Sequence, residues 1–204
     1  MEWSKDVARD LLHIQAVQIN AKEYFTWTSG IQSPIYCDNR LTMSYPAIRR
    51  KITDAFVHIM EAQGAKPDVI AGCATAGIPH ASWLAERLDL PMVYVRSKPK
   101  GHGKGNQIEG EVKPGQRVIV IEDLISTGGS SLESAHALQQ EGANVTGVLA
   151  IFTYGLKKSK ESFEAAGISL NTITGFDILL EALLEDEKLT ATEKEELIAW
   201  RDAL

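Results

Sequence analysis

The sequence predicts an α/β fold in which a parallel central sheet is flanked by helices on both faces. Short apolar runs typical of buried strands alternate with longer stretches of helical periodicity. The clearest run, 118–121, is apolar at every position, as a strand buried on both faces must be. In such a sheet ligands bind at the carboxyl ends of the strands. The residues that follow each strand are therefore the candidates for a site.

Composition indicates an ordinary globular protein that suits one domain spanning residues 1–204. Of the 204 residues, 44% are hydrophobic and 24% charged, enough for a sizeable core. We find no internal repeat, low-complexity tract or linker. No apolar run approaches the roughly 20 residues that span a bilayer, and the first residues do not resemble a signal peptide. We therefore expect a cytoplasmic protein with no membrane partner.

The net charge and the cysteine content narrow the class of protein further. The formal net charge of −6 argues against non-specific nucleic-acid binding. Cys37 and Cys73 lie far apart and form no C-x-x-C pair, so free buried thiols in a reducing compartment are expected.

The N-terminal part is predicted to form a helix and a short hairpin. Apolar residues at helical spacing predict an amphipathic helix from residue 4 to about 20 that packs on the body of the protein. Two β-prone runs, 24–30 and 34–37, follow and are expected to pair with each other. Their aromatic residues either cover a flat ligand or pack in the core, and the sequence leaves both open: Phe25, Trp27 and Tyr36.

The middle of the chain alternates between helices and strands. Ser44 as a cap and Pro46 in the first turn predict a helix that runs to Gly64. Small residues at 73–77 follow strand 67–72 and let the backbone approach a ligand closely. The remaining elements expected are helix 78–88, strand 91–95, strand 118–121, helix 129 to about 141, strand 145–152, helix 156–166, strand 168–173, helix 176–184 and a last helix to about 202 that opens with the capping box Thr190-x-x-Glu193.

Residues 96–110 have neither helical nor strand periodicity. They carry five basic or potentially basic side chains before Asn106, among several glycines, in an otherwise acidic protein. A loop this long in a compact domain is usually functional or disordered. The composition favours a flap that closes over a polyanion, and a solvated linker is the alternative. The glycines lack the spacing and the following helix of a dinucleotide fingerprint.

Two adjacent carboxylates, Glu122 and Asp123, stand at the carboxyl end of strand 118–121. Burying them for stability alone is costly, so we expect a partner: vicinal hydroxyls, a metal or a cation. Residues 126–130 then supply hydroxyls and free backbone N–H groups at a helix start, which favours an anion. No lysine follows the glycines as in a nucleoside-triphosphate P-loop. A plain strand-to-helix connection is the structural alternative to a site for sugar hydroxyls and a phosphate.

These residues carry a resemblance to a known family. Residues 120–130, Val-Ile-Glu-Asp-Leu-Ile-Ser-Thr-Gly-Gly-Ser, resemble the phosphoribosyl pyrophosphate (PRPP) motif of type I phosphoribosyltransferases. The flap Arg96-x-x-x-Lys100-x-His102-Gly103 resembles the catalytic loop of the orotate phosphoribosyltransferases. The early Phe25-Thr26-x-x-Ser29-Gly30-x-x-Ser33-Pro34-x-Tyr36 resembles their orotate-side segment. The resemblance implies the type I fold, with a small N-terminal hood of about residues 1–40 and a flexible catalytic loop at 96–110.

The resemblance also implies a reaction: orotate and PRPP give orotidine 5′-monophosphate and pyrophosphate, with Mg²⁺ held mainly through PRPP and not by protein ligands. It implies Lys100, Asp123 and Glu122 as catalytic residues and Ser126 as a contact to orotate. It further implies a homodimer whose flap closes over the neighbouring subunit's site. The implied PRPP-binding residues are Arg96, Lys100, His102, Glu122, Asp123, Leu124, Ile125, Ser126, Thr127, Gly128, Gly129 and Ser130.

Some positions depart from the pattern of the family. Thr28, Ala76 and Tyr154 stand where some relatives carry a basic residue, and Ser97 replaces a second cation beside Arg96. The partner of the orotate carboxylate is therefore left open. Two other functions share the PRPP motif: a purine phosphoribosyltransferase, and a PRPP-binding regulator of nucleic acid. The orotate-like flap argues against the first, and the acidic chain without an added DNA-binding domain argues against the second.

Overall fold

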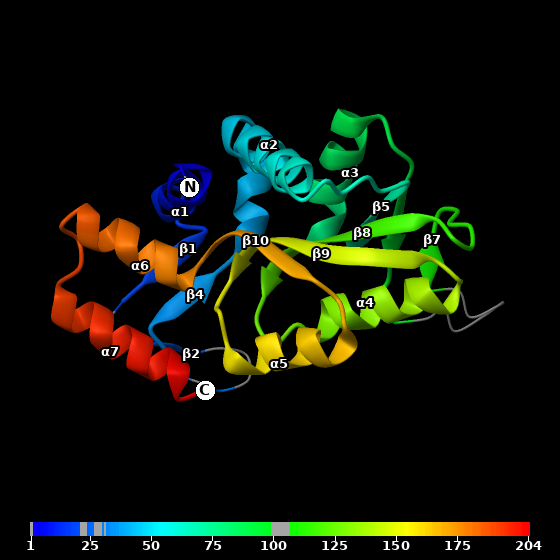
Figure 1. The fold of residues 1–204 in the computed structure, drawn as a ribbon. Coiled ribbons are helices and arrows are strands. Elements are labelled where there is room, and N and C mark those ends of the chain that lie inside the picture. Colours follow the sequence, from blue (N-terminus) through cyan, green and yellow to red (C-terminus); the bar gives the residue numbers. More distant parts are fainter. Residues whose placement is uncertain (1, 21–23, 27–29, 31, 99–106) are drawn as a thin grey trace.

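A six-stranded sheet forms the centre of the protein in the computed structural model (Figure 1), which describes residues 2–20, 24–26, 30, 32–98 and 107–204. The strand order is β10-β9-β8-β5-β6-β7, and every neighbouring pair is parallel except β6 with β7. The predicted parallel sheet is thus confirmed, with one antiparallel edge strand added. The strands are β5 (Val69–Cys73), β6 (Met92–Val95), β7 (Ile108–Glu109), β8 (Arg117–Ile125), β9 (Asn144–Thr153) and β10 (Leu170–Gly175).

Helices cover both faces of the sheet (Figure 1). On β8, Ile119 and Ile121 belong to one buried apolar cluster, whereas Val118 and Val120 belong to the other. Because side chains alternate across a strand, this division shows that β8 is buried on both faces, as predicted. The first cluster packs against α1 (Glu2–His13), α2 (Pro46–Ala62), α3 (Gly77–Leu88) and α6 (Phe176–Glu185), and the second against α4 (Gly129–Gln140) and α5 (Lys157–Ala166).

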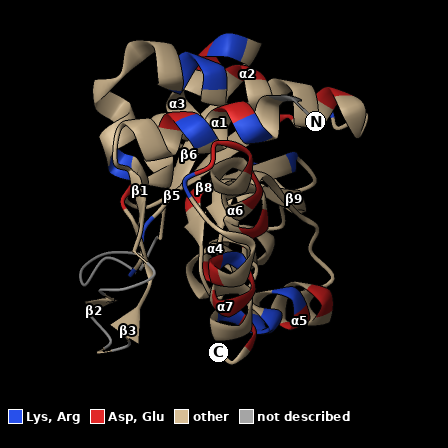
Figure 2. Ribbon diagram, turned by 90° about the vertical axis from the view of Figure 1, so that its left-hand side faces the viewer, with Lys and Arg blue, Asp and Glu red and all other residues tan. Residues whose placement is uncertain are grey.

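The N-terminal region differs from the prediction in two ways. The helix ends at His13 and not near residue 20, because Gln15 takes a positive φ of 58° and the chain then enters β1 (Val17–Ile19). The run at 34–37 does not pair with the run at 24–30. Instead β4 (Ile35–Cys37) pairs with β1, and β2 (Phe25–Thr26) pairs with β3 (Gln32–Ser33). In Figure 2 the β2–β3 pair extends away from the six-stranded sheet.

Three smaller predictions also need correction. Ser44 does not cap α2; it ends a 3-10 helix, η1 (Asn39–Ser44), and Tyr45 takes the cap position before Pro46. The strand predicted at 118–121 extends as β8 to Ile125, because pairing with β9 continues to that residue. The end of the predicted loop 96–110 forms edge strand β7. The capping box of α7 (Ala191–Asp202) is confirmed, with both reciprocal hydrogen bonds present.

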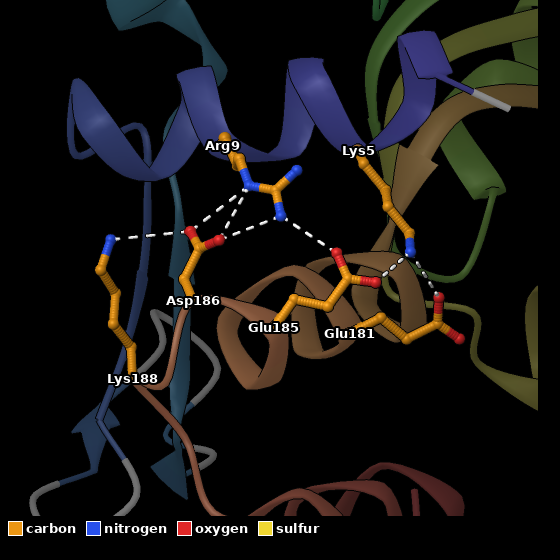
Figure 3. Close-up of polar contacts among 6 residues, drawn as sticks. All are labelled: Lys5, Arg9, Glu181, Glu185, Asp186 and Lys188. Atoms are coloured by element: carbon orange, nitrogen blue, oxygen red, sulfur yellow. Dashed lines mark hydrogen bonds and ion pairs between the residues drawn. The ribbon is translucent and has the colours of Figure 1, made fainter.

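Helix α1 is joined to α6 by a network of ion pairs (Figure 3). The Arg9 guanidinium lies 3.0 Å from carboxylate oxygens of both Glu185 and Asp186. Lys5 pairs with Glu185 as well, and its ammonium lies 3.9 Å from Glu181. Pairs this exposed contribute little to stability, because water and salt screen them. The apolar face of α1, which buries Val7 and Leu11, contributes more to this contact.

Within the described part of the chain, no helix has both the length and the apolar character required to cross a bilayer.

Candidate active site

The two acids lie where β8 loses one of its neighbours. Strand β5 pairs with β8 only as far as Gly72 opposite Ile121, whereas β9 stays paired to the end of β8. Helix α3 begins at Gly77 directly against β8, and a Cβ at Gly77 would lie 2.3 Å from the Ile121 carbonyl oxygen. Only glycine permits this approach. Glu122 and Asp123 thus occupy the carboxyl edge of the sheet, next to the start of α3.

The Glu122 carboxylate is held from two directions. The Ser130 hydroxyl, in the first turn of α4, donates to Oε2 at 3.1 Å, and the Asp123 N–H donates to Oε1 at 3.1 Å. The Asp123 carbonyl oxygen accepts a 2.7 Å hydrogen bond from Asn39 Nδ2. Side chains therefore satisfy both backbone groups of Asp123 on the side where β5 has ended.

Burial shapes the electrostatics of this pair. It raises the pKa of the Glu122 carboxyl, and the neighbouring Asp123 charge raises it further. Burial also raises the pKa of Asp123, although Arg40 acts in the opposite direction. The thiol of Cys73, at the end of β5, has a raised pKa because it is buried and lies near Glu122. Two charged carboxylates are therefore disfavoured here until hydroxyl donors or a cation arrive.

Without ligands, Glu122→Gln is expected to gain stability relative to the wild type when the pH is raised from 5 to 8. The folded-state pKa of Glu122 lies above its ordinary 4.5, so its charge destabilises the folded state increasingly as pH rises above 4.5. Any hydrogen bond of Glu122 that glutamine cannot make is missing at both pH values, so it does not affect the change in the stability difference between pH 5 and pH 8. Thermal unfolding measures this change, at about 2–4 °C per kcal/mol. Glu133→Gln, exposed on α4, is the control for loss of one charge. A Tm difference that is the same at both pH values would contradict this account.

The start of α4 provides the second half of the site. Gly128 precedes the helix with a φ of 84°, and a Cβ there would lie 2.6 Å from the Phe163 ring. No side chain of the described residues caps this helix start. The first backbone N–H groups of a helix lack partners within the helix and favour an anion. The acids and this anion-favouring turn are adjacent in the chain and in space, which the Ser130–Glu122 hydrogen bond shows directly.

The structure locates most of the predicted site residues. Glu122, Asp123, Leu124 and Ile125 lie in β8, and 126–130 form the turn into α4 and its first residues. Ile125 is buried in the apolar cluster on one face of the sheet, and Leu124 packs against the cluster on the other face.

The flap is only partly described. Arg96 follows β6, its N–H donates to the Gln107 carbonyl at 2.9 Å, and its guanidinium lies 3.6 Å from Glu109. Lys100 and His102 lie outside the described residues. The structure thus brings the motif at 122–130 together and leaves the flap residues untested.

Sequence reasoning missed Asn39 and Arg40, which act on Asp123 from η1. Asn39 is fully buried and lies 84 positions before the carbonyl that it contacts. The one signal in the sequence was a short polar group, 38–40, that follows a predicted strand.

Among the described residues, no group of three or more His, Cys, Asp or Glu side chains lies together in a way that could hold a metal ion. A cation at this site would meet the two carboxylates of Glu122 and Asp123. Two carboxylates with raised pKa values fit that arrangement, because a nearby cation favours their charged forms.

Comparisons with known proteins agree with this geometry. The family model described as phosphoribosyl transferase domain matches residues 43–174. Orotate phosphoribosyltransferase from Oceanobacillus iheyensis is 63% identical over 98% of this chain and 100% of its own length. The protein of the same name from Listeria monocytogenes is 53% identical over 98% of this chain and 96% of its own. The crystal structure of orotate phosphoribosyltransferase from Aeropyrum pernix matches with a TM-score of 0.78 and 30% identity, over 88% of this chain and 98% of that one.

Proposed function

The chain belongs to the orotate phosphoribosyltransferase family, and from this premise we propose how its residues carry out the reaction. The protein is an enzyme with the type I phosphoribosyltransferase fold. It transfers the phosphoribosyl group from PRPP to orotate, which gives orotidine 5′-monophosphate and pyrophosphate in pyrimidine nucleotide synthesis. The observation that carries the assignment of roles is the placement of buried Glu122 and half-buried Asp123 beside the uncapped start of α4.

The turn at 126–130 binds the 5′-phosphate of PRPP. Backbone N–H groups at the start of α4, including that of Ser130, and the hydroxyls of Ser126 and Thr127 supply the donors, and the helix dipole favours the negative charge. The left-handed conformation of Gly128 turns the chain from the strand into this helix.

Glu122 and Asp123 bind the ribose hydroxyls. Each carboxylate gains hydroxyl donors that offset its loss of water, so bound ribose favours the charged forms. As pyrophosphate leaves, positive charge develops near the anomeric carbon of the ribose. Two negative side chains already fixed at that place stabilise this transition state more than the ground state.

Arg96, Lys100 and His102 neutralise the pyrophosphate. Charge builds on this leaving group during the reaction, so a cation that meets it then lowers the barrier, and Lys100 has the main role. Orotate is already an anion at its attacking nitrogen and needs no strong general base. Ser126 contacts orotate from the turn.

Mg²⁺ is the expected cofactor and would be held mainly by oxygens of PRPP and by water. When bound, it supplies positive charge to the pyrophosphate group. Glu122 and Asp123 are acids of the proposed PRPP site, and their raised pKa values fit a role in which positive charge arrives with the substrate.

A cytoplasmic homodimer with shared sites completes the proposal. Three large apolar side chains near η1 are exposed, Leu41 at 40%, Met43 at 36% and Tyr45 at 43%. They flank the segment whose Asn39 contacts Asp123. A second copy seated there would cover these apolar side chains.

The orotate assay tests the function. We expect the purified protein to consume orotate only when PRPP and Mg²⁺ are both present, measured as the loss of orotate absorbance. Adenine and hypoxanthine should not be turned over in the same mixture. Turnover of a purine without turnover of orotate would replace this function with that of a purine phosphoribosyltransferase. PRPP binding without turnover of any base would favour the regulator.

A further inference from the structure

We propose that Asn39, Thr42 and His80 form a buried chain of hydrogen bonds that positions Asp123 for phosphoribosyl transfer. None of the three needs to touch a substrate, so they are positioning residues. The inference rests on the role proposed above for Asp123 and adds to it a part of the molecule that the PRPP motif does not include.

Asp123 needs such support because it lies beyond the end of β5. Pairing with β5 stops at Ile121, so the sheet no longer fixes that side of β8. Asn39 Nδ2 donates to the Asp123 carbonyl at 2.7 Å and takes the place of the missing strand. A carbonyl shielded from water and left without a donor would be unfavourable. The position of Asn39 therefore fixes the position of the Asp123 backbone.

Asn39 is in turn fixed by Thr42. Both residues are fully buried in η1, and the Thr42 hydroxyl donates to the Asn39 carbonyl at 2.6 Å. The hydroxyl has a single proton, which this bond uses. Its second contact, 3.3 Å from His80 Nε2, is therefore one in which Thr42 accepts and His80 donates.

His80 must accordingly carry its proton on Nε2 and leave Nδ1 bare. His80 Nδ1 makes no hydrogen bond to any part of the chain that the structure describes, as expected for a bare nitrogen in an apolar place. Burial lowers the pKa of His80 to about 4, so the ring stays neutral at pH 7. A neutral Nε2–H tautomer is what the chain of hydrogen bonds requires.

The series of contacts through His80, Thr42 and Asn39 begins and ends on the same strand, β8. Helix α3 starts at Gly77 against the Ile121 carbonyl, and His80 lies one turn further along α3. The His80 ring packs edge-on against Trp83 with centroids 5.3 Å apart. From His80 the contacts pass through Thr42 and Asn39 to the Asp123 carbonyl. Because this series of contacts is closed, the backbone of Asp123, from which the acid projects, cannot shift without moving α3 or η1. A misplacement of about 1 Å in a catalytic group costs on the order of 10²-fold in rate.

Paired substitutions at Thr42 and His80 test the proposal. Thr42→Val removes the hydroxyl at nearly constant shape and should lower kcat about tenfold, with KM for orotate changed less than about twofold. Thr42→Ser keeps the hydroxyl and should stay within about twofold of the wild type. His80→Leu should behave as Thr42→Val does, and His80→Gln, whose amide can donate from the place of Nε2, should restore activity.

Thr53→Val is the matched control. Thr53 is also buried, and its hydroxyl donates to the Arg49 carbonyl at 2.9 Å within α2, away from the chain of hydrogen bonds. It should lose stability comparably and keep its kcat. Wild-type kcat in Thr42→Val, or equal losses in the conservative and non-conservative variants, would overturn the proposal.

Two further measurements keep the outcome decisive. Nitrogen-15 NMR of the wild-type histidines should show His80 neutral with its proton on Nε2, whether or not a variant folds, and the opposite tautomer would overturn the proposal. Asp123→Asn separates this inference from the role on which it rests. If Asp123→Asn is inactive and Thr42→Val is fully active, the positioning role of the hydrogen-bond chain is refuted and the role of Asp123 is retained. If Asp123→Asn is active, the proposed role of Asp123 itself is refuted.

Discussion

Asp123→Asn is expected to lower kcat/KM by about 10²–10³-fold while the fold stays intact. Asparagine keeps the shape of the side chain and leaves the backbone hydrogen bond from Asn39 unchanged. It removes the negative charge that, in the proposed mechanism, stabilises positive charge near the anomeric carbon. The acid is half-buried, and the loss of water around it makes an electrostatic interaction stronger than in bulk water. Most of the loss should therefore appear in kcat, not in KM for orotate.

Steady-state kinetics with orotate, PRPP and Mg²⁺ measure this effect. Asp68→Asn is the matched control, because Asp68 pairs with Arg117 at the opposite end of the same strand, with a side-chain distance of 2.7 Å. That pair is exposed to solvent, so its loss should cost little stability and leave kcat unchanged. If Asp123→Asn turned over as fast as Asp68→Asn, the acid would have no part in the chemical step.

Lys100→Ala is expected to lower kcat by orders of magnitude, with the thermal stability of the wild type retained. The reason is chemical: negative charge builds on pyrophosphate as it leaves, and a cation that meets it only then acts on the transition state. Lys113→Ala, which removes an exposed lysine before β8, is the control for loss of one positive charge. A near-wild-type kcat for Lys100→Ala would remove this residue from the catalytic role.

Mixing the two inactive variants, Lys100→Ala and Asp123→Asn, is expected to restore activity. If the flap acts on the partner's site, a mixed dimer contains one site with both residues intact. Random exchange should then recover about a quarter of the wild-type activity. The same mixture has no intact site if the flap closes over its own subunit. No recovery after subunit exchange has been verified would exclude donation between subunits.

Much of the fold was predictable because its signals are local. Alternating apolar runs and helical periodicity predicted the parallel sheet, and Thr190 with Glu193 predicted the start of α7. The turn at 126–130 that leads into α4 was also predictable, since strand, acids, hydroxyls and glycines follow one another without interruption in 117–130.

The errors occurred where a residue's state depends on partners distant in the sequence. Apolar spacing suggested a helix to residue 20, yet Val17 pairs with Cys37, and that pairing exists only once the chain has folded back. The run at 34–37 pairs with β1 and not with the run at 24–30, because tertiary packing determines which strands pair. Ile108 became part of an edge strand because β6 offered it a free edge.

The acids themselves show the same division. The sequence by itself determined that Glu122 and Asp123 stand at the end of a buried strand and beside a turn suited to phosphate. Only the tertiary structure decided what holds them: the close approach of Gly77 to Ile121, the hydrogen bond from Asn39, and the burial that raises their pKa values. A local pattern records which groups the chain offers, whereas desolvation and hydrogen-bond partners depend on segments up to 84 positions away that meet only in the folded protein.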